Sequence, residues 1–239
     1  MREVVLRKRQ YLMNELLIMI PAYNEEKNIE AVLKSLQRTT SFADILVIDD
    51  GSKDDTFRVC RSLGARCARH RVNLGLSSAI RTGMKYALEN GYSYALQFDG
   101  DGQHDPEAIA GMLETAKKND NNITIGSRYL EKKGGSAMKA LGRGIISLCI
   151  LITTGQRITD PTSGMRIYDR RVMELFMSSV HYSPEPDTLS FVLRKGMKVS
   201  EVQVLMKDRA HGRSYLDITE SIRYMFRMCT SILLVQWFR

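Results

Sequence analysis

Four short apolar runs, each ended by polar or turn-forming residues, recur along the first two thirds of the chain and predict buried strands. These runs are residues 16–20, 45–48, 94–98 and 123–125. The segments between them carry apolar residues at helical spacing and predict helices. The predicted helices are residues 28–37, 56–63, 77–88 and 106–118. Because strands and helices alternate, the pattern favours an α/β fold with a mostly parallel central sheet.

The remainder of the chain is less regular. Residues 145–152 are apolar except for Ser147, but this run is shorter than the roughly 18–20 residues that a membrane-spanning helix needs. Residues 199–206 predict a late strand, and residues 217–238 predict a long terminal helix. We find no internal repeat or linker, so we expect one catalytic domain over 1–215, followed by a C-terminal amphipathic helix over 216–239.

Composition narrows the classes of partner. The 239 residues are 44% hydrophobic, which is typical of a globular protein, and 35 Lys and Arg against 27 Asp and Glu give a net charge of +8. This surplus predicts an anionic partner such as nucleic acid, a phosphorylated substrate or an anionic membrane. Nucleic acid is not favoured, because the chain lacks clustered basic and aromatic stretches. The four cysteines form no C-x-x-C pair, which indicates reduced thiols in a cytosolic protein.

The basic residues 7–9 resemble the start of a signal peptide, but Asn14 and Glu15 interrupt the apolar residues that follow. We therefore expect no signal peptide and no self-contained membrane anchor.

Polar clusters follow three of the predicted strands. They read Pro-Ala-Tyr-Asn-Glu at 21–25, Asp-Asp-Gly-Ser at 49–52 and Asp-Gly-Asp-Gly-Gln-His at 99–104. Ligands of open α/β sheets bind beyond the carboxyl ends of strands. Acids gathered at one edge repel each other unless a cation compensates, and Mg²⁺ or Mn²⁺ suits carboxylate oxygens. The clusters therefore predict a metal-assisted site at this edge.

Four further motifs follow in order: Asn-Leu-Gly-Leu at 73–76, Gly-Ser-Arg-Tyr at 126–129, Asp-Pro-Thr-Ser-Gly at 160–164 and Arg-Ala-His-Gly-Arg-Ser at 209–214. Together with the three clusters, they resemble family 2 glycosyltransferases with the GT-A (Rossmann-like) fold. The last two motifs resemble the dolichyl- or polyprenyl-phosphate sugar transferase branch. The resemblance covers about residues 16–214.

The resemblance implies roles for the residues of these motifs. The nucleotide-sugar donor would be bound by Pro21, Tyr23, Glu25, Asp50, Asp99, Arg128, Arg209 and Arg213. Asp101 and Gln103 would be direct metal ligands, with His104 in an outer-shell or packing role. Arg128 could pair with either a phosphate or a carboxylate, and both partners remain open. The family often has a Lys where this chain has Tyr215, so Arg213 is the candidate substitute for that cation.

Asp160 and Asp101 are the expected catalytic residues. By resemblance, Asp160 faces the reacting centre, where it would orient the acceptor or the sugar. Ser163, Glu185 and Asp187 are second-rank candidates for contact with acceptor or sugar; the alternative for the two acids is that they cap the next helix.

The terminal helix combines an apolar face with Arg223, Arg227, Arg239 and the aromatic pair Trp237 and Phe238. This pattern suits a helix lying in a membrane interface, although packing on the domain or on another subunit is equally compatible.

The expected activity is metal-dependent, inverting transfer of a hexose or N-acetylhexosamine from a UDP- or GDP-sugar to a polyprenyl phosphate. The enzyme would act at the cytoplasmic face of the membrane as a peripheral protein, with a separate transmembrane partner subunit and a homo-oligomer both compatible with the sequence. One alternative is a saccharide hydroxyl as acceptor, in cell-wall or surface polysaccharide synthesis. Another is a non-catalytic partner that binds nucleotide sugar or glycan.

Overall fold

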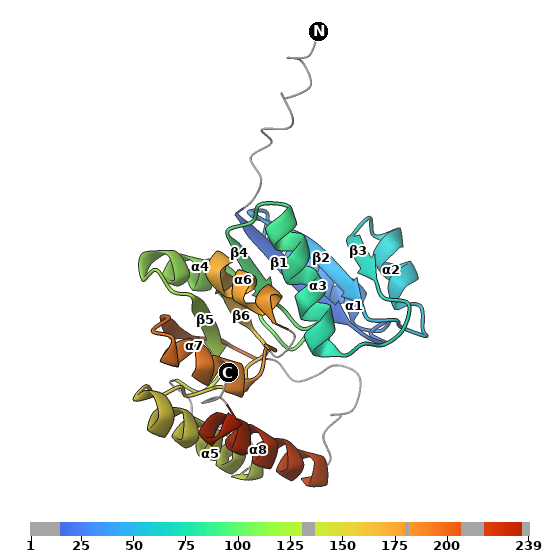
Figure 1. Ribbon diagram of the computed structural model, residues 1–239. Helices are drawn as coiled ribbons and strands as arrows, with labels where there is room; N and C mark the ends of the chain where they lie inside the picture. Colours follow the sequence, from blue (N-terminus) through green and yellow to red (C-terminus); the bar gives the residue numbers. More distant parts are fainter. Residues whose placement is uncertain (1–14, 131–136, 180–181, 207–217, 236–239) are drawn as a thin grey trace.

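The structure, a computed structural model, describes residues 15–130, 137–179, 182–206 and 218–235 (Figure 1). Its strands are β1 (Leu16–Ala22), β2 (Ala43–Asp49), β3 (Arg66–Arg69), β4 (Tyr94–Gln97), β5 (Ile123–Ser127), β6 (Arg166–Asp169) and β7 (Val199–Gln203). They form one sheet in the order β3-β2-β1-β4-β6-β5-β7. Only β6 runs antiparallel to its neighbours in this described sheet, so the predicted mostly parallel α/β fold is confirmed.

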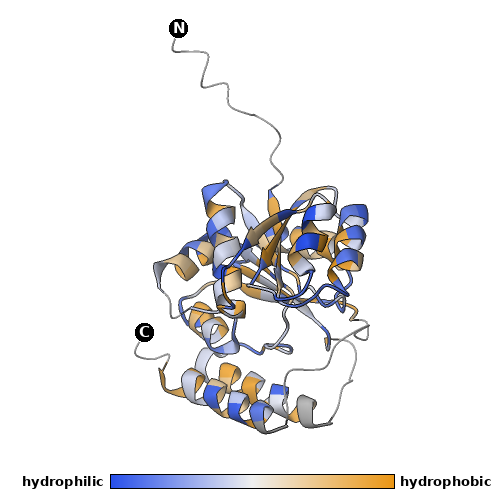
Figure 2. Ribbon diagram, turned by 90° about the vertical axis from the view of Figure 1, so that its right-hand side faces the viewer, coloured by the Kyte–Doolittle hydropathy of each residue, from blue (hydrophilic) through white to orange (hydrophobic). Residues whose placement is uncertain are grey.

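Helices cover both faces of the sheet (Figures 1 and 2). They are α1 (Ile29–Thr39), α2 (Thr56–Ser62), α3 (Leu76–Glu89), α4 (Ala108–Lys118), α5 (Ala137–Thr154), α6 (Arg170–Ser178), α7 (Pro186–Arg194) and α8 (Ile218–Leu233). One apolar core lies between the sheet and α1, α2 and α4; the other lies between the sheet and α3 and α6 and extends to α5, α7 and α8. In β1, Ile18 and Ile20 enter the first core and Leu17 and Met19 enter the second, because successive side chains of a strand point to opposite faces.

The eight predicted strands and helices of the first 125 residues are present, with ends that differ by at most two residues. The sequence pattern did not predict β3, β6 or α6. The strands β3 and β6 have four residues each, too few for a clear period of two. In β6, Arg166 is buried, so the strand also lacks the apolar run on which the other strands were recognised.

The helices α5 and α8 lie side by side at one end of the molecule, and α7 separates them from the sheet (Figure 1). The apolar residues 145–152 form the middle of α5, an 18-residue helix, and not a separate short element. Ile146 and Ile150 of α5 and Met228 and Ile232 of α8 are buried in the second core. The described part of the terminal helix therefore packs on the domain through one of its faces.

Candidate active site

The three acidic clusters lie at the carboxyl ends of adjacent strands. The strands β2, β1 and β4 are neighbours in the sheet and run parallel, so residues 49–52, 21–25 and 99–104 come to the same edge. The strand β5 runs in the same direction and brings Arg128 to this edge. Because β6 runs the opposite way, residues 160–164, which precede it, also reach this edge. The convergence that the sequence predicted is present.

Asp50 organises the loop that precedes α3. Its carboxylate accepts hydrogen bonds from the backbone N–H groups of Leu74, at 2.9 Å, and Gly75, at 2.7 Å. The Nδ1 atom of His70 lies 2.7 Å from the same carboxylate, and its Nε2 atom lies 2.8 Å from the hydroxyl of Thr82. Asp50 is 4% exposed. The predicted donor-binding acid thus also holds the loop before α3 at this edge of the sheet. His70 is a partner of Asp50 that the sequence motifs did not include.

The turn after β1 is fastened to the turn after β2. Asn24 has a left-handed backbone, with φ of 57°, and its N–H donates to the hydroxyl of Ser52 at 3.0 Å. The N–H of Glu25 donates to the hydroxyl of Thr56 at 2.8 Å. Pro21, Tyr23 and Glu25 are all partly exposed at this edge. The backbone that carries these predicted donor-binding residues is therefore held in place by the hydrogen bonds that it donates to Ser52 and to Thr56 at the start of α2.

Asp99 and Asp101 occupy the loop after β4. The side chain of Asp99 is 34% exposed and lies 3.1 Å from Nε2 of His104, which is itself buried and packs on Phe98. Burial by itself would raise the pKa of Asp99, but its hydrogen bond and electrostatic attraction to His104, assisted by Gln97 and Arg128, hold that pKa below its ordinary value. Asp99 is therefore stabilised as a carboxylate.

The same loop offers oxygen donors to a hard cation. Asp101 is 7% exposed and accepts the backbone N–H of Gln103 at 3.0 Å. Within the described residues, no three His, Cys, Asp or Glu side chains are arranged to hold a metal by themselves. Asp99, Asp101 and Gln103 supply carboxylate and amide oxygens, which fit a divalent cation that takes further ligands from a bound substrate. His104 contacts Asp99 and packs on Phe98, so the outer-shell role and the packing role that the sequence left open are both compatible with its position.

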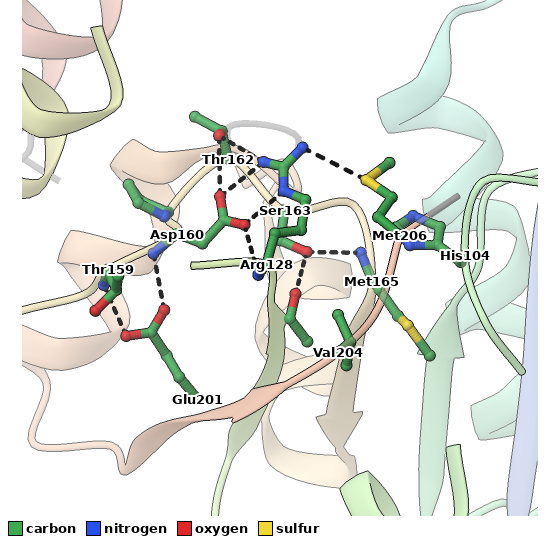
Figure 3. Close-up of polar contacts among 12 residues, drawn as sticks. His104, Arg128, Thr159, Asp160, Thr162, Ser163, Met165, Glu201, Val204 and Met206 are labelled. Atoms are coloured by element: carbon green, nitrogen blue, oxygen red, sulfur yellow. Dashed lines mark hydrogen bonds and ion pairs between the residues drawn. The ribbon is translucent and has the colours of Figure 1, made fainter. Parts of the chain in front are cut away.

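Arg128 and Asp160 form a bidentate ion pair (Figure 3). The guanidinium donates from Nε to Oδ2 at 2.6 Å and from Nη2 to Oδ1 at 2.7 Å, and the backbone N–H of Arg128 donates to Oδ2 at 3.1 Å. Burial lowers the pKa of Arg128, but Asp160 outweighs this effect and the pKa is raised. Asp160 is fully buried. Of the two partners that the sequence left open for Arg128, the structure shows the carboxylate.

The loop 160–164 lies against the loop of Asp99. A Cβ atom added to Gly164 would clash with the Asp99 carboxylate, so only glycine allows this approach. The hydroxyl of Ser163 donates to the carbonyl of Gly126 at 2.6 Å, and Ser163 is 2% exposed. In this structure Ser163 thus fastens the loop to β5, while its contact with acceptor or sugar stays a prediction.

Glu185 and Asp187 contact α8. The Oε1 atom of Glu185 accepts from Arg227 at 2.9 Å, and Oδ2 of Asp187 accepts from the hydroxyl of Ser231 at 2.8 Å. Glu185 precedes α7 but makes no side-chain capping hydrogen bond. The two acids therefore join α7 to α8, a role that neither sequence interpretation included. Arg209 and Arg213 lie outside the described residues.

Motif comparison also missed Glu201, whose carboxylate accepts the backbone N–H groups of Thr159 and Asp160 at 2.7 and 2.8 Å (Figure 3). A single acid inside a predicted strand carries no sequence signal for such a contact.

A mostly parallel α/β sheet with acidic loops at the carboxyl ends of adjacent strands is the arrangement of an enzyme that can bind a nucleotide and a divalent cation. The model of the family described as Glycosyl transferase family 2 matches residues 17–176, more than half of the chain, and the chain therefore belongs to this family of glycosyltransferases.

Named relatives and a solved structure agree with this membership. The dolichol-phosphate mannosyltransferase of Pyrococcus furiosus is 32% identical over 230 residues, covering 88% of this chain and 62% of the relative. The UDP-N-acetylglucosamine–dolichyl-phosphate N-acetylglucosaminyltransferase of Methanococcus voltae is 28% identical over 210 residues, covering 78% and 83%. Glucosyl-3-phosphoglycerate synthase of Mycobacterium tuberculosis, in complex with Mn²⁺, UDP and glucosyl-3-phosphoglycerate, matches with a TM-score of 0.64 at 18% identity, covering 92% of this chain and 79% of that chain. This last likeness shows the fold alone.

Proposed function

We propose that this chain transfers one hexose or N-acetylhexosamine from a UDP- or GDP-sugar to a polyprenyl phosphate of the undecaprenyl or dolichyl type, with inversion at the anomeric carbon. The observation that carries the proposal is the convergence of the loops 21–25, 49–52 and 99–104 at one sheet edge. The relatives named above use dolichyl or dolichol phosphate as acceptors, and one of them uses a UDP-sugar.

The donor would lie along this edge. Pro21, Tyr23, Glu25 and Asp50 would surround its base and ribose, and Asp99 would lie next to the ribose. Support comes from the rigid backbone of this wall, which the hydrogen bonds of Asp50 and Ser52 hold in place. A preformed wall binds a nucleotide without a large ordering cost.

Asp101 and Gln103, with Asp99 nearby, would hold Mg²⁺ or Mn²⁺. The cation, when bound, stabilises the negative charge that grows on the departing nucleoside diphosphate. The protein's own contribution is to keep Asp99 ionised and Asp101 oriented: His104 holds Asp99 as an anion, and the backbone N–H of Gln103 orients Asp101. A solved relative of the same fold contains Mn²⁺ with UDP.

The state of Asp160 favours a phosphate acceptor over a hydroxyl. A hydroxyl acceptor needs a general base, whereas a lipid phosphate is already an anion near neutral pH. Asp160 is fully buried and both of its oxygens accept hydrogen bonds from Arg128, so neither oxygen is directed at an acceptor hydroxyl. We propose that Asp160 orients Arg128, and that the exposed part of this guanidinium attracts the phosphate of the acceptor or donor.

The helices α5 and α8 suit peripheral contact with a membrane at its cytoplasmic face. Their outward sides expose large apolar residues, namely Leu141, Leu148, Leu151, Ile152, Ile222, Phe226 and Leu233. The exposed Arg223 would add about 1 kcal/mol on anionic lipid, whereas the exposed Arg227 is paired with Glu185. Within the described ranges, no helix combines the length and apolar character that crossing a bilayer requires. In this proposal residues 1–215 are the catalytic domain and residues 216–239 are the helix that docks on the membrane. A transmembrane partner subunit or a second copy of the chain are the other candidates for covering the outward face of α5 and α8.

An acceptor assay tests the function. The purified chain is incubated with Mn²⁺ and radiolabelled UDP- or GDP-sugars, and with either polyprenyl phosphate or free saccharides. We expect label in the lipid fraction with one donor, and little with saccharides. Label in saccharides alone would show that the acceptor is a saccharide hydroxyl, as in the alternative function. If the chain neither transfers sugar nor hydrolyses any of the donors, only a binding role remains and the proposal is refuted.

A further inference from the structure

Glu201 is a carboxylate at a position where an apolar residue would be expected. It lies in β7, where alternate side chains share a face, so it points to the same face as Val199. Val199 packs against the second apolar core, whereas Val202, on the opposite face, packs against the first. A carboxylate that is partly buried beside an apolar core costs free energy unless hydrogen bonds compensate. Glu201 therefore requires partners.

Its partners are two consecutive backbone N–H groups. Thr159 donates to Oε2 at 2.7 Å and Asp160 donates to Oε1 at 2.8 Å (Figure 3). These residues precede Glu201 by about forty positions and follow α5, so the contact joins the loop before β6 to an edge strand. Hydrogen bonds to a charged acceptor are short and stronger than neutral ones. Glu201 thus fixes the backbone at the point where the 160–164 loop begins.

The contacts continue from residues 159–160 to the sheet edge at which the acidic loops converge. Asp160 directs its own side chain to Arg128 through two hydrogen bonds of 2.6 and 2.7 Å. Arg128 keeps 23% of its side chain exposed, and the loop that begins at Asp160 lies against the Asp99 carboxylate at Gly164. Glu201 is therefore connected to the edge without reaching it, because Asp160 and Arg128 stand between them.

We propose that Glu201 is a positioning residue for sugar transfer: it holds the backbone of residues 159–160 so that Asp160 presents the Arg128 guanidinium to the substrate phosphate. This inference rests on the proposed function and adds to it a residue outside the motifs. The competing explanation is that Glu201 only stabilises the fold. The two differ in one respect, since a positioning role acts through Arg128 and a purely structural role does not.

Glu201→Gln is the first test. The amide keeps the size of the side chain but offers one acceptor oxygen, and its NH₂ group faces the second backbone N–H. We expect kcat to fall about 10- to 100-fold, as for other residues that orient an active-site group. The Kd for UDP, measured by calorimetry, stays within about twofold, because the donor wall is carried by β1 and β2. Glu174→Gln is the matched control: Glu174 pairs with Arg170 on the exposed side of α6, and its kcat stays at the wild-type value.

A double-mutant cycle separates the two explanations. Arg128→Lys keeps the charge but removes the fork that Asp160 holds. If Glu201 acts through Arg128, adding Glu201→Gln to Arg128→Lys lowers kcat much less than it does in the wild-type background. Equal losses in both backgrounds would overturn the positioning role.

Glu201→Asp keeps the test decisive if the Gln variant does not fold. It retains the charge and both oxygens but draws them back by one methylene. We expect a folded protein with reduced kcat and unchanged Kd for UDP, and a wild-type kcat would overturn the inference. A wild-type chain that transfers no sugar to lipid phosphate refutes the proposed function itself. A wild-type chain that transfers sugar, with Glu201 variants equally active, refutes only the role of Glu201.

Discussion

At the scale of single residues, the loops of Asp99 and Asp160 meet at Gly164. The glycine has no Cβ, and this absence is what lets the backbone of 160–164 approach the Asp99 carboxylate. Asp99 receives two constraints, one from His104 and one from this backbone, and both limit the rotamers that it adopts. A change at Gly164 therefore acts on the orientation of Asp99 more than on the fold.

We predict that Gly164→Ala lowers kcat about 100-fold, because the added methyl group forces the Asp99 carboxylate away from its position. The clashing atoms are the end of the partly exposed Asp99 side chain, which can move aside, so we expect the free energy of unfolding to fall by no more than about 1 kcal/mol. Steady-state kinetics and thermal unfolding measure the two effects. Gly111→Ala is the control: Gly111 lies exposed in α4 with no atom near an added Cβ, so stability rises by about 0.5–1 kcal/mol and kcat stays constant. Wild-type kcat in Gly164→Ala would show that Asp99 does not need this position.

At the scale of elements, the sequence predicted the strands that have apolar runs, and β7 as a late strand, but it missed the short strands β3 and β6. The strands β1, β2, β4 and β5 were recognisable from short apolar runs, and the polar residues after them located the edge of the site. The strand β6 has only four residues and includes the buried Arg166, whose guanidinium donates to the carbonyls of Pro161 and Ser163. Tertiary contacts, and not local pattern, make this segment a strand.

The same distinction applies to the candidate site. Residues within motifs were identified from their order along the chain. Glu201 and His70 were missed, because each acts through partners distant in the sequence: Glu201 through Asp160, and His70 through Asp50. The link of Glu185 and Asp187 to α8 was missed for the same reason.

The outward faces of α5 and α8 support a prediction at this scale. Ile152 is 67% exposed and Phe226 is 72% exposed, so replacing both by Glu removes apolar contact and adds two negative charges without disturbing a core. We predict that the double variant binds anionic phospholipid vesicles at least tenfold more weakly in a co-sedimentation assay, while its thermal midpoint stays close to that of the wild type. Gln37→Glu, on the exposed side of α1, adds negative charge elsewhere and leaves vesicle binding nearly unchanged. Equal binding by the double variant and the wild type would assign this face to a protein partner.

At the scale of the whole molecule, the strand order brings two groups of candidate site residues to one edge of the sheet. The loops proposed to bind the donor follow β1 and β2, whereas Arg128, Asp160 and Glu201 come from the β5, β6 and β7 side of the sheet. The strand β4 lies between the two groups and carries the loop of Asp99 and Asp101. A cation held by this loop would be positioned between the donor and the group that attracts phosphate, so donor binding and metal binding should depend on each other.

This dependence gives the last prediction. UDP should bind the wild-type chain at least tenfold more tightly with Mn²⁺ than with excess EDTA, a difference of about 1.4 kcal/mol or more, because the cation joins the diphosphate to the carboxylates. Asp101→Asn removes one of these charges and should abolish most of the Mn²⁺ effect while leaving the metal-free affinity unchanged. Asp105→Asn, a change of the same kind four residues later, should retain the effect. Calorimetry measures the UDP affinity of all three chains with and without Mn²⁺. If neither UDP nor GDP associates with the wild-type chain, with Mn²⁺, with Mg²⁺ or without metal, the edge formed by β2, β1 and β4 is not a nucleotide-sugar site.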